Sequence, residues 1–284
     1  MRKDILDPKV DFVFKQIFGS EKHPEILISF LNSVFATKGT KKEIVQVEID
    51  NSDLEKDWED DKYSRLDIKA TANDETRINI EIQLKNQYNM KRRTLYYWSK
   101  LFESQIKEGE AYEELQKTVT INILNFNYLK MNERYHNTYI LKEKETNEIL
   151  TNLQEIHFIE LPKLNEEQFE DIGKIESKRK EDNLIPWVLF LKNPDSEVIK
   201  MLEERIEELQ EAAEVLEVLS HDEETREIYE RRQKAIHDEI SNITGAIKEV
   251  AMNLLELDVD IETIVKATGL SEEKVKKLKS QIDE

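Results

Sequence analysis

The sequence predicts an α/β fold, in which a mixed β-sheet flanked by helices is followed by an acidic helical region. Three observations support this prediction. Strand-like segments with alternating apolar and polar residues lie between segments of helical periodicity in the first half of the chain. The 284 residues, of which 38% are hydrophobic, suffice for a substantial core. From residue 196 onward, apolar residues recur every three or four positions, as in long helices.

Two helices and a strand are expected first. Asp7 and Pro8 are suited to the cap and first turn of a helix, and Gly19 is suited to its end. A second helix is expected from 24 to about 37, and a strand from 44 to 49.

A β-hairpin is expected next. The stretches 63–70 and 77–84 alternate between apolar and polar residues, and Asn73 and Asp74 are typical turn residues between them. An antiparallel pairing centred near residue 74 sets Asp67 opposite Glu81 and Arg65 opposite Gln83.

Two carboxylates opposite one another repel and weaken a sheet, so a cation is expected between Asp67 and Glu81. A hard divalent ion with oxygen ligands fits, because Mg²⁺ is usually held by one or two carboxylates together with water and phosphate oxygens. The alternative is an exposed polar strand face without a ligand.

The remaining sheet region contains a helix from about 87 to 107 and strands at 118–126, 137–142 and 155–161, followed by a short helix at 185–192. The aromatic and aliphatic residues of the first of these helices are expected to lie mostly in the core: Tyr96, Tyr97, Trp98, Leu101 and Phe102. The alternative for Tyr96 or Tyr97 is a position facing the site.

The C-terminal region is expected to be helical throughout. Two helices separated at 221–224 carry continuous apolar seams, which either an intramolecular antiparallel hairpin or a homo-oligomer would cover. Two short helices joined at Gly269 end the chain and resemble a helix-turn-helix, with packing and DNA reading as the two interpretations. We therefore expect three parts: 1–195, 196–255 and 256–284.

Composition and charge limit the classes of function that the protein can have. The chain has no cysteine, which excludes disulfides and thiolate chemistry and fits a cytoplasmic location, and its five histidines lack ligand spacing. Neither a signal peptide nor a membrane span is expected. The net charge of −19 is uneven: residues 1–130 contain 21 Lys and Arg against 23 Asp and Glu, whereas residues 131–284 contain 21 against 38. The near-neutral half is therefore the one suited to a polyanion such as DNA.

Several segments in this half resemble the PD-(D/E)XK nuclease superfamily, and within it the recombination-promoting nucleases described as PD-(D/E)XK nuclease family transposases. They occur in the family's order: DPKVDFVFKQIFG, SRLDIKA, INIEIQL and RRTLYYWSKLFESQIKEGEAYEEL. The resemblance implies a restriction-endonuclease-like fold for 1–195 and Mg²⁺-dependent DNA endonuclease activity associated with recombination or mobile elements, with Mn²⁺ as a substitute metal.

The resemblance also implies residue roles. Asp67, Glu81 and the carbonyl of Ile82 would hold the metal, and Gln83 would orient the attacking water. Gln83 departs from the wider superfamily, which usually has Lys there, so Lys85 is a candidate for the missing positive charge. Asp11 is a further candidate metal-site residue, with an ion pair to Lys15 as the alternative. The basic residues expected to contact nucleic acid are Lys15, Arg65, Lys69, Lys91, Arg92 and Arg93.

Two other functions remain open at this point. A catalytically silent nuclease-like core could serve as a DNA-binding or protein-interaction module, and a nuclease could be held inactive by its own acidic tail. Metal binding and DNA cleavage distinguish an active enzyme from a silent module.

Overall fold

The computed structural model describes residues 5–50, 68–86, 89–169 and 172–282. They form two compact units, which divide between Arg226 and Glu227. The predicted division into 1–195, 196–255 and 256–284 stays a prediction, and we describe each unit by itself.

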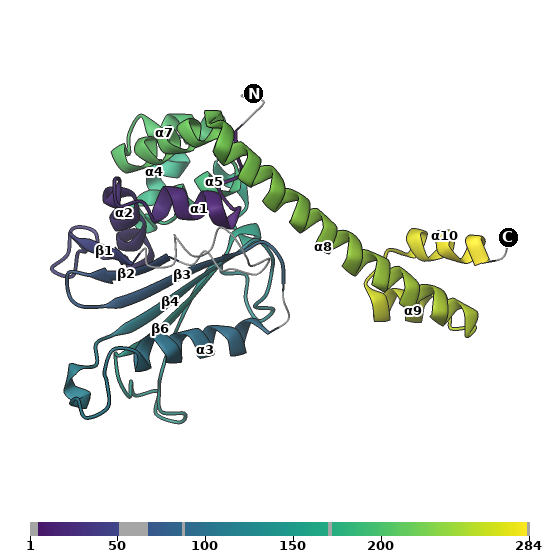
Figure 1. Ribbon diagram of the computed structural model, residues 1–284, viewed down its shortest axis with the longest axis horizontal. Coiled ribbons are helices and arrows are strands. Elements are labelled where there is room, and N and C mark those ends of the chain that lie inside the picture. Colours follow the sequence, from purple (N-terminus) through teal and green to yellow (C-terminus); the bar gives the residue numbers. More distant parts are fainter. Residues whose placement is uncertain (1–4, 51–67, 87–88, 170–171, 283–284) are drawn as a thin grey trace. The chain divides into compact units, whose positions relative to one another are not determined.

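The first unit is built on a six-stranded mixed sheet, which confirms the predicted α/β class (Figure 1). The strand order is β1-β2-β3-β4-β6-β5. Strands β3, β4 and β6 are parallel to one another, whereas β1, β2 and β5 pair antiparallel with their neighbours. The bounds are β1 Val47–Asp50, β2 Ile68–Ala72, β3 Arg77–Gln83, β4 Thr118–Leu124, β5 His136–Ile140 and β6 Gln154–Glu160.

The β2–β3 hairpin has the predicted register at each described pair. Ile68 lies opposite Ile80, and Thr71 lies opposite Arg77. Asp67, and with it the predicted pairing of Asp67 with Glu81, lies outside the described residues.

One face of the sheet is apolar and is covered by helices from both ends of the first unit, namely α1 Asp11–Phe18, α2 Pro24–Phe35 and α5 Ile185–Lys192 (Figure 1). Phe18, Phe30 and Trp187 join these helices, with ring centroids 5.3 to 6.1 Å apart. Helix α1 begins at Asp11 rather than at Pro8, because the Asp7 carboxylate accepts a hydrogen bond from the Lys9 amide and stabilises a turn before the helix.

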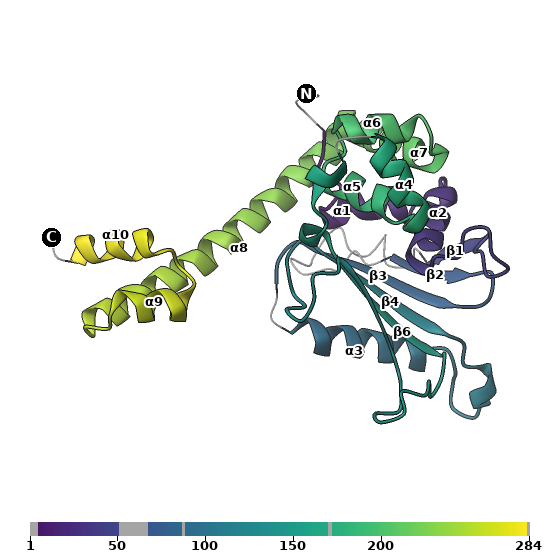
Figure 2. The same ribbon diagram turned by 180° about the vertical axis from the view of Figure 1, so that it is seen from behind.

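The opposite face is covered by α3, Met90–Glu103, as both views of the ribbon show (Figures 1 and 2). Within this helix only Met90 and Thr94 are buried. The expectation that this helix places its aromatic and aliphatic residues mostly in the core is wrong. Tyr96 is 52% exposed, and the other four are only half-buried: Tyr97, Trp98, Leu101 and Phe102. Met90 packs into an apolar cluster with Leu124 and Phe158 at the end of the sheet.

Helices α4 Ile172–Glu181, α6 Glu197–Glu203 and α7 Glu207–His221 complete the first unit. Helix α7 packs against α1, α2 and α6, and its apolar residues Leu209 and Leu216 are buried there.

The last three helices are α8 Glu223–Glu256, α9 Ile261–Thr268 and α10 Glu272–Ile282, and nearly all of their residues belong to the second unit. Ala251 of α8, Ile264 of α9, and Val275 and Leu278 of α10 share a small core. Gly269 ends α9 in the left-handed conformation, with φ of 73°, which allows the tight turn into α10. The antiparallel packing of α7 on α8 stays a prediction.

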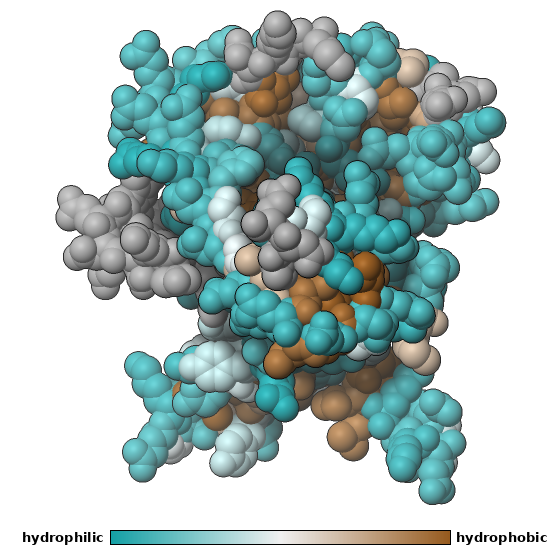
Figure 3. All heavy atoms as spheres, turned by 90° about the vertical axis from the view of Figure 1, so that its right-hand side faces the viewer, coloured by the Kyte–Doolittle hydropathy of each residue, from teal (hydrophilic) through white to brown (hydrophobic). Residues whose placement is uncertain are grey.

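One face of the molecule carries mostly polar side chains (Figure 3). Figure 3 shows mostly hydrophilic residues with smaller hydrophobic patches, in keeping with 36% charged residues. In the part of the chain that the structure describes, no helix is long and apolar enough to cross a membrane.

Candidate active site

Glu81 lies in β3 on the sheet face that α3 covers, and only 2% of it is exposed. Its Oε1 atom accepts a hydrogen bond of 2.7 Å from Nε2 of Gln83, two residues further along the same strand. The predicted alternation of β3 therefore holds, because the polar side chains of Glu81 and Gln83 meet on one face.

Arg93 of α3 forms an ion pair with Glu81, through its Nη2 atom and the same Oε1 atom. Thr94, the next residue, donates a hydrogen bond of 2.9 Å to the buried Asn122 of β4 and fixes this turn of α3 on the sheet. The Arg93 guanidinium also lies 5.8 Å from the ring centre of Tyr97. The structure thus brings together Glu81, Gln83 and Arg93 from the predicted set.

The sequence prediction assigned Arg93 to nucleic acid and did not include the ion pair. Met90 and Thr94, four residues apart, mark the face of α3 that is buried against the sheet. Arg93 flanks this stripe, and that spacing is the signal that could have placed it near a strand residue.

Buried polar atoms cluster around this pair. Among the described residues, the buried side-chain atoms on this face without a hydrogen-bond partner include Oε2 of Glu81, Nδ2 of Asn79 and Oγ1 of Thr120. Asn79 and Thr120 lie opposite one another in the β3–β4 ladder. A buried carboxylate oxygen without a partner is costly, so a further ligand at Glu81 is physically reasonable.

Glu81 has the chemistry for a hard divalent cation, since its orphaned carboxylate oxygen is the type of donor that Mg²⁺ prefers. Three or more His, Asp or Glu side chains do not gather into a metal site anywhere in the described ranges. Asp67, the other predicted carboxylate ligand, is not in those ranges. Ile82 is buried next to Glu81 in β3.

Other predicted residues lie near this face. Lys69 is half-buried in β2, opposite Asn79, and therefore near the polar row of β3. Lys85 is half-buried in the bend that follows β3. Lys91 and Arg92 are exposed in the first turn of α3, while Arg65 lies outside the described residues.

Asp11 and Lys15 belong to α1 and therefore to the opposite side of the sheet from α3 (Figure 1). Lys15 is only 4% exposed. A Cβ atom added at Gly19 would lie 3.3 Å from Cγ of Lys15 and 3.4 Å from Cγ1 of Ile68. The aliphatic part of the Lys15 side chain and Ile68, the first described residue of β2, are thus both close to Gly19. Ile68 directly follows Asp67 in the sequence.

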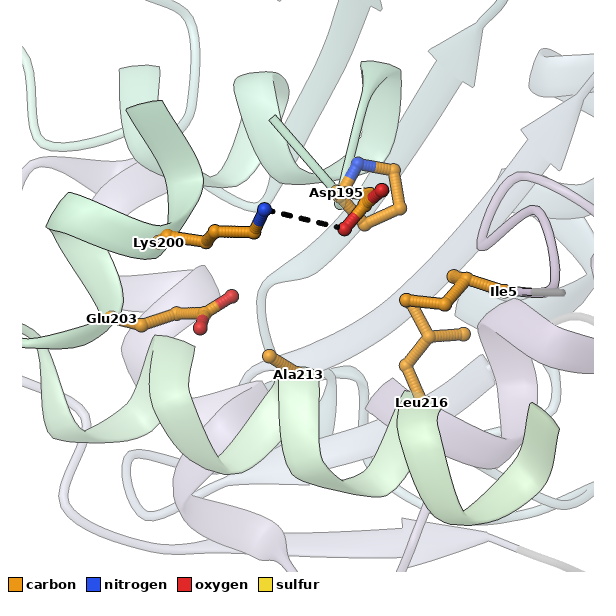
Figure 4. Close-up of a pocket in the computed structure, with 7 residues that line it drawn as sticks. Ile5, Asp195, Lys200, Glu203, Ala213 and Leu216 are labelled. Carbon is orange, nitrogen blue, oxygen red and sulfur yellow. Dashed lines mark ion pairs between the residues drawn. The ribbon is translucent and has the colours of Figure 1, made fainter. Parts of the chain in front are cut away.

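Two hollows in the described part of the chain are lined by other residues. One of about 20 Å³ is bordered by Ile5, Lys200, Glu203 and Leu216, and Figure 4 shows Lys200 paired there with Asp195 at 3.7 Å. A wider, open depression is lined by Arg77 and Gln105 near the start of β3.

A second polar network lies on the apolar face of the sheet and was not predicted. Buried His157 contacts Glu155 at 2.7 Å through Nε2 and His136 at 2.9 Å through Nδ1. Glu155 also pairs with Lys117 at 2.6 Å. Burial alone would raise the pKa of Glu155, but hydrogen bonds from His157 and Lys117 outweigh it and lower the pKa to about 2. We interpret this network as structural because its carboxylate and imidazole groups are mutually paired.

The network predicts that the protein loses stability in mild acid. Burial, and after it repulsion from His157, lowers the pKa of His136 from 6.5 to about 4. As the pH falls, the unfolded chain therefore binds a proton at His136 before the folded chain does. The stability that neutral His136 contributes is complete above pH 6.5 and is lost as the pH falls to about 4. The expected loss is on the order of 3 kcal/mol.

Urea unfolding of His136→Gln and of the wild type between pH 7 and pH 4 measures this loss. The stability difference between the two proteins should shrink as the pH falls, whereas His221→Gln at an exposed position should show no such change. A stability difference that stays constant between pH 7 and pH 4 would exclude His136 as the source of the loss of stability in acid.

A family model described as PD-(D/E)XK nuclease family transposase matches residues 8–246. No curated protein and no solved structure matches. The matched range contains the six strands of the sheet and α3, and therefore Glu81, Gln83 and Arg93.

Proposed function

The chain belongs to the PD-(D/E)XK nuclease family transposases, and we propose that it is a Mg²⁺-dependent endonuclease that hydrolyses phosphodiester bonds in DNA. Membership supports nuclease activity in general, a DNA substrate and a link to mobile elements. Recombination is the process in which we place this activity.

The observation that carries the proposal is the buried Glu81 carboxylate. One of its oxygens is bonded to Arg93 and Gln83, and the other has no partner among the described residues. A purely structural glutamate in a sheet interior would be expected to use both oxygens, because an unpaired buried acceptor destabilises the fold.

PD-(D/E)XK nucleases generally use divalent metals. We propose that Asp67, Glu81 and the carbonyl of Ile82 hold Mg²⁺, for which Mn²⁺ can substitute. When bound, the ion supplies Lewis acidity toward a phosphate oxygen and lowers the pKa of water. Gln83, which already donates to Glu81, orients the attacking water through its carboxamide. Lys85 contributes the positive charge that Gln83 lacks.

We propose that the predicted basic residues contact DNA. Lys91 and Arg92 are exposed in the first turn of α3, where cations are unfavourable because the helix dipole is positive there. Such a placement lowers helix stability, and an anionic ligand such as a phosphate would compensate for it. Arg65, Lys69 and Arg93 are proposed to contribute to the same surface. Asp11 and Lys15 are proposed to support the site from α1.

A metal-dependent cleavage assay tests the function. Supercoiled and linear DNA should both be cut by the wild-type protein with Mg²⁺ or Mn²⁺, and excess chelator should stop the reaction. Absence of cleavage and of divalent-ion binding would instead support a silent DNA-binding or protein-interaction module.

We also propose that the C-terminal helices form a homo-oligomer. Ile240, Ile243 and Val250 of α8 follow the spacing of a coiled-coil seam and are 44 to 52% exposed. Light scattering of the full chain should give at least a dimer mass. Ile243→Glu should reduce this mass to that of a monomer, while Asn242→Glu, with the same added charge off the seam, should not.

A cytoplasmic location stays the prediction made from the absence of cysteine.

A further inference from the structure

The ion pair of Arg93 with Glu81 places a cation on the carboxylate to which the metal is assigned. We propose that Arg93 is the site's internal counterion, which holds Glu81 in the metal-free protein and weakens divalent-ion binding until it moves to the DNA phosphate. This inference rests on the function proposed above and adds a regulatory role for one residue.

Electrostatics supports this role for Arg93. Glu81 is 2% exposed, and the Arg93 side chain is 13% exposed. A buried carboxylate is stable only when it is paired and hydrogen-bonded. Among the described residues, Arg93 forms an ion pair with Glu81. It therefore balances the negative charge that a metal ion would otherwise balance.

The ion pair of Arg93 with Glu81 is asymmetric. Arginine and a carboxylate commonly form two parallel hydrogen bonds that use both oxygens. Here Arg93 and Gln83 converge on Oε1, whereas Oε2 is buried without a partner in the described part of the chain. The arrangement leaves one oxygen for another ligand.

A released Arg93 has other favourable contacts nearby. A divalent ion on Glu81 would repel a guanidinium so close to it. The Tyr97 ring centre, 5.8 Å from the guanidinium carbon, offers a second favourable contact on the same helix. Lys91 and Arg92 are exposed in the adjacent positions, so a released Arg93 would join a basic surface that attracts phosphate.

The test is a calorimetric titration of the metal-free full chain with Mn²⁺, without DNA. Arg93→Gln is expected to bind Mn²⁺ roughly 10-fold more tightly than the wild type, because a repelling charge is removed. Its metal-free melting temperature should be lower and should rise more on Mn²⁺ addition than that of the wild type.

Two further variants serve as controls. Arg92→Gln removes the same charge from an exposed neighbouring position and should leave the affinity within about 2-fold. Should Arg93→Gln fail to fold, Arg93→Lys should show a smaller increase in affinity, since lysine pairs less rigidly with a carboxylate.

The titration separates the two proposals. If Glu81→Gln loses Mn²⁺ binding but Arg93→Gln binds no more tightly than the wild type, the counterion role is refuted and the nuclease assignment stands. If Glu81→Gln binds Mn²⁺ as the wild type does, or the wild type binds none, the metal site itself is wrong and both proposals fail.

Discussion

Asp67→Ala is expected to abolish Mg²⁺-dependent nicking of plasmid DNA while leaving the fold intact. The proposed site has two carboxylate ligands, and the loss of one leaves too few oxygen donors for a hard divalent ion. We expect the cleavage rate to fall by about 10³-fold or more, the size seen when a group essential to the transition state is removed.

The matched control for this change lies in the same hairpin. Asp74 is in the turn between β2 and β3, where its carboxylate accepts a hydrogen bond from the Thr76 amide at 3.2 Å. Asp74→Ala removes the same chemical group away from the site and should retain cleavage. Circular dichroism of both variants checks their folding. Wild-type nicking rates in Asp67→Ala would remove this residue from the mechanism.

Glu160→Ala is expected to destabilise the first unit by about 3–5 kcal/mol, because it leaves a buried lysine without its counter-charge. Glu160 is fully buried at the end of β6, and its Oε2 atom lies 2.8 Å from Nζ of Lys163. Its Oε1 atom accepts hydrogen bonds from the Tyr128 and Leu129 amides. Lys163 donates to the Leu129 and Asn132 carbonyls, so this pair joins the 128–132 loop to the sheet.

Urea denaturation followed by tryptophan fluorescence measures this effect, since Trp187 lies in the core of the same unit. Glu197→Ala breaks a pair in which the glutamate is 84% exposed and should change stability little. A loss below about 1 kcal/mol for Glu160→Ala would show that Lys163 finds water or another partner.

The strands could be predicted because each carries a local pattern. In β4, Thr118, Thr120 and Asn122 alternate with Val119, Ile121 and Ile123, and the two sets face opposite sides of the sheet. The hairpin register could also be predicted, because Asn73 and Asp74 fix the turn from which the pairing is counted. The α5 bounds of 185–192 agree with the prediction for the same reason, since a short apolar run between polar residues marks its extent.

The partners of buried polar groups could not be predicted from local patterns. The position of Arg93 beside Glu81 depends on how α3 is rotated against the sheet, and that rotation is set by contacts such as Thr94 with Asn122. The pairing of Glu160 with Lys163 depends on the path of the chain after β6. For the candidate site, the sequence indicated the chemistry of Glu81 and Gln83 but not Arg93 as the cation that neutralises Glu81.

The position of β3 in the sheet determines which side of the site can move. This strand is bonded on one edge to β2 and on the other to β4, so Glu81 is fixed by ladders in both directions. Helix α3 begins without a side-chain cap and with basic residues at its positive end, and both features weaken its first turn. We therefore expect β3 to be the rigid half of the proposed site, and the first turn of α3 to be the half whose fraying would open it to a substrate.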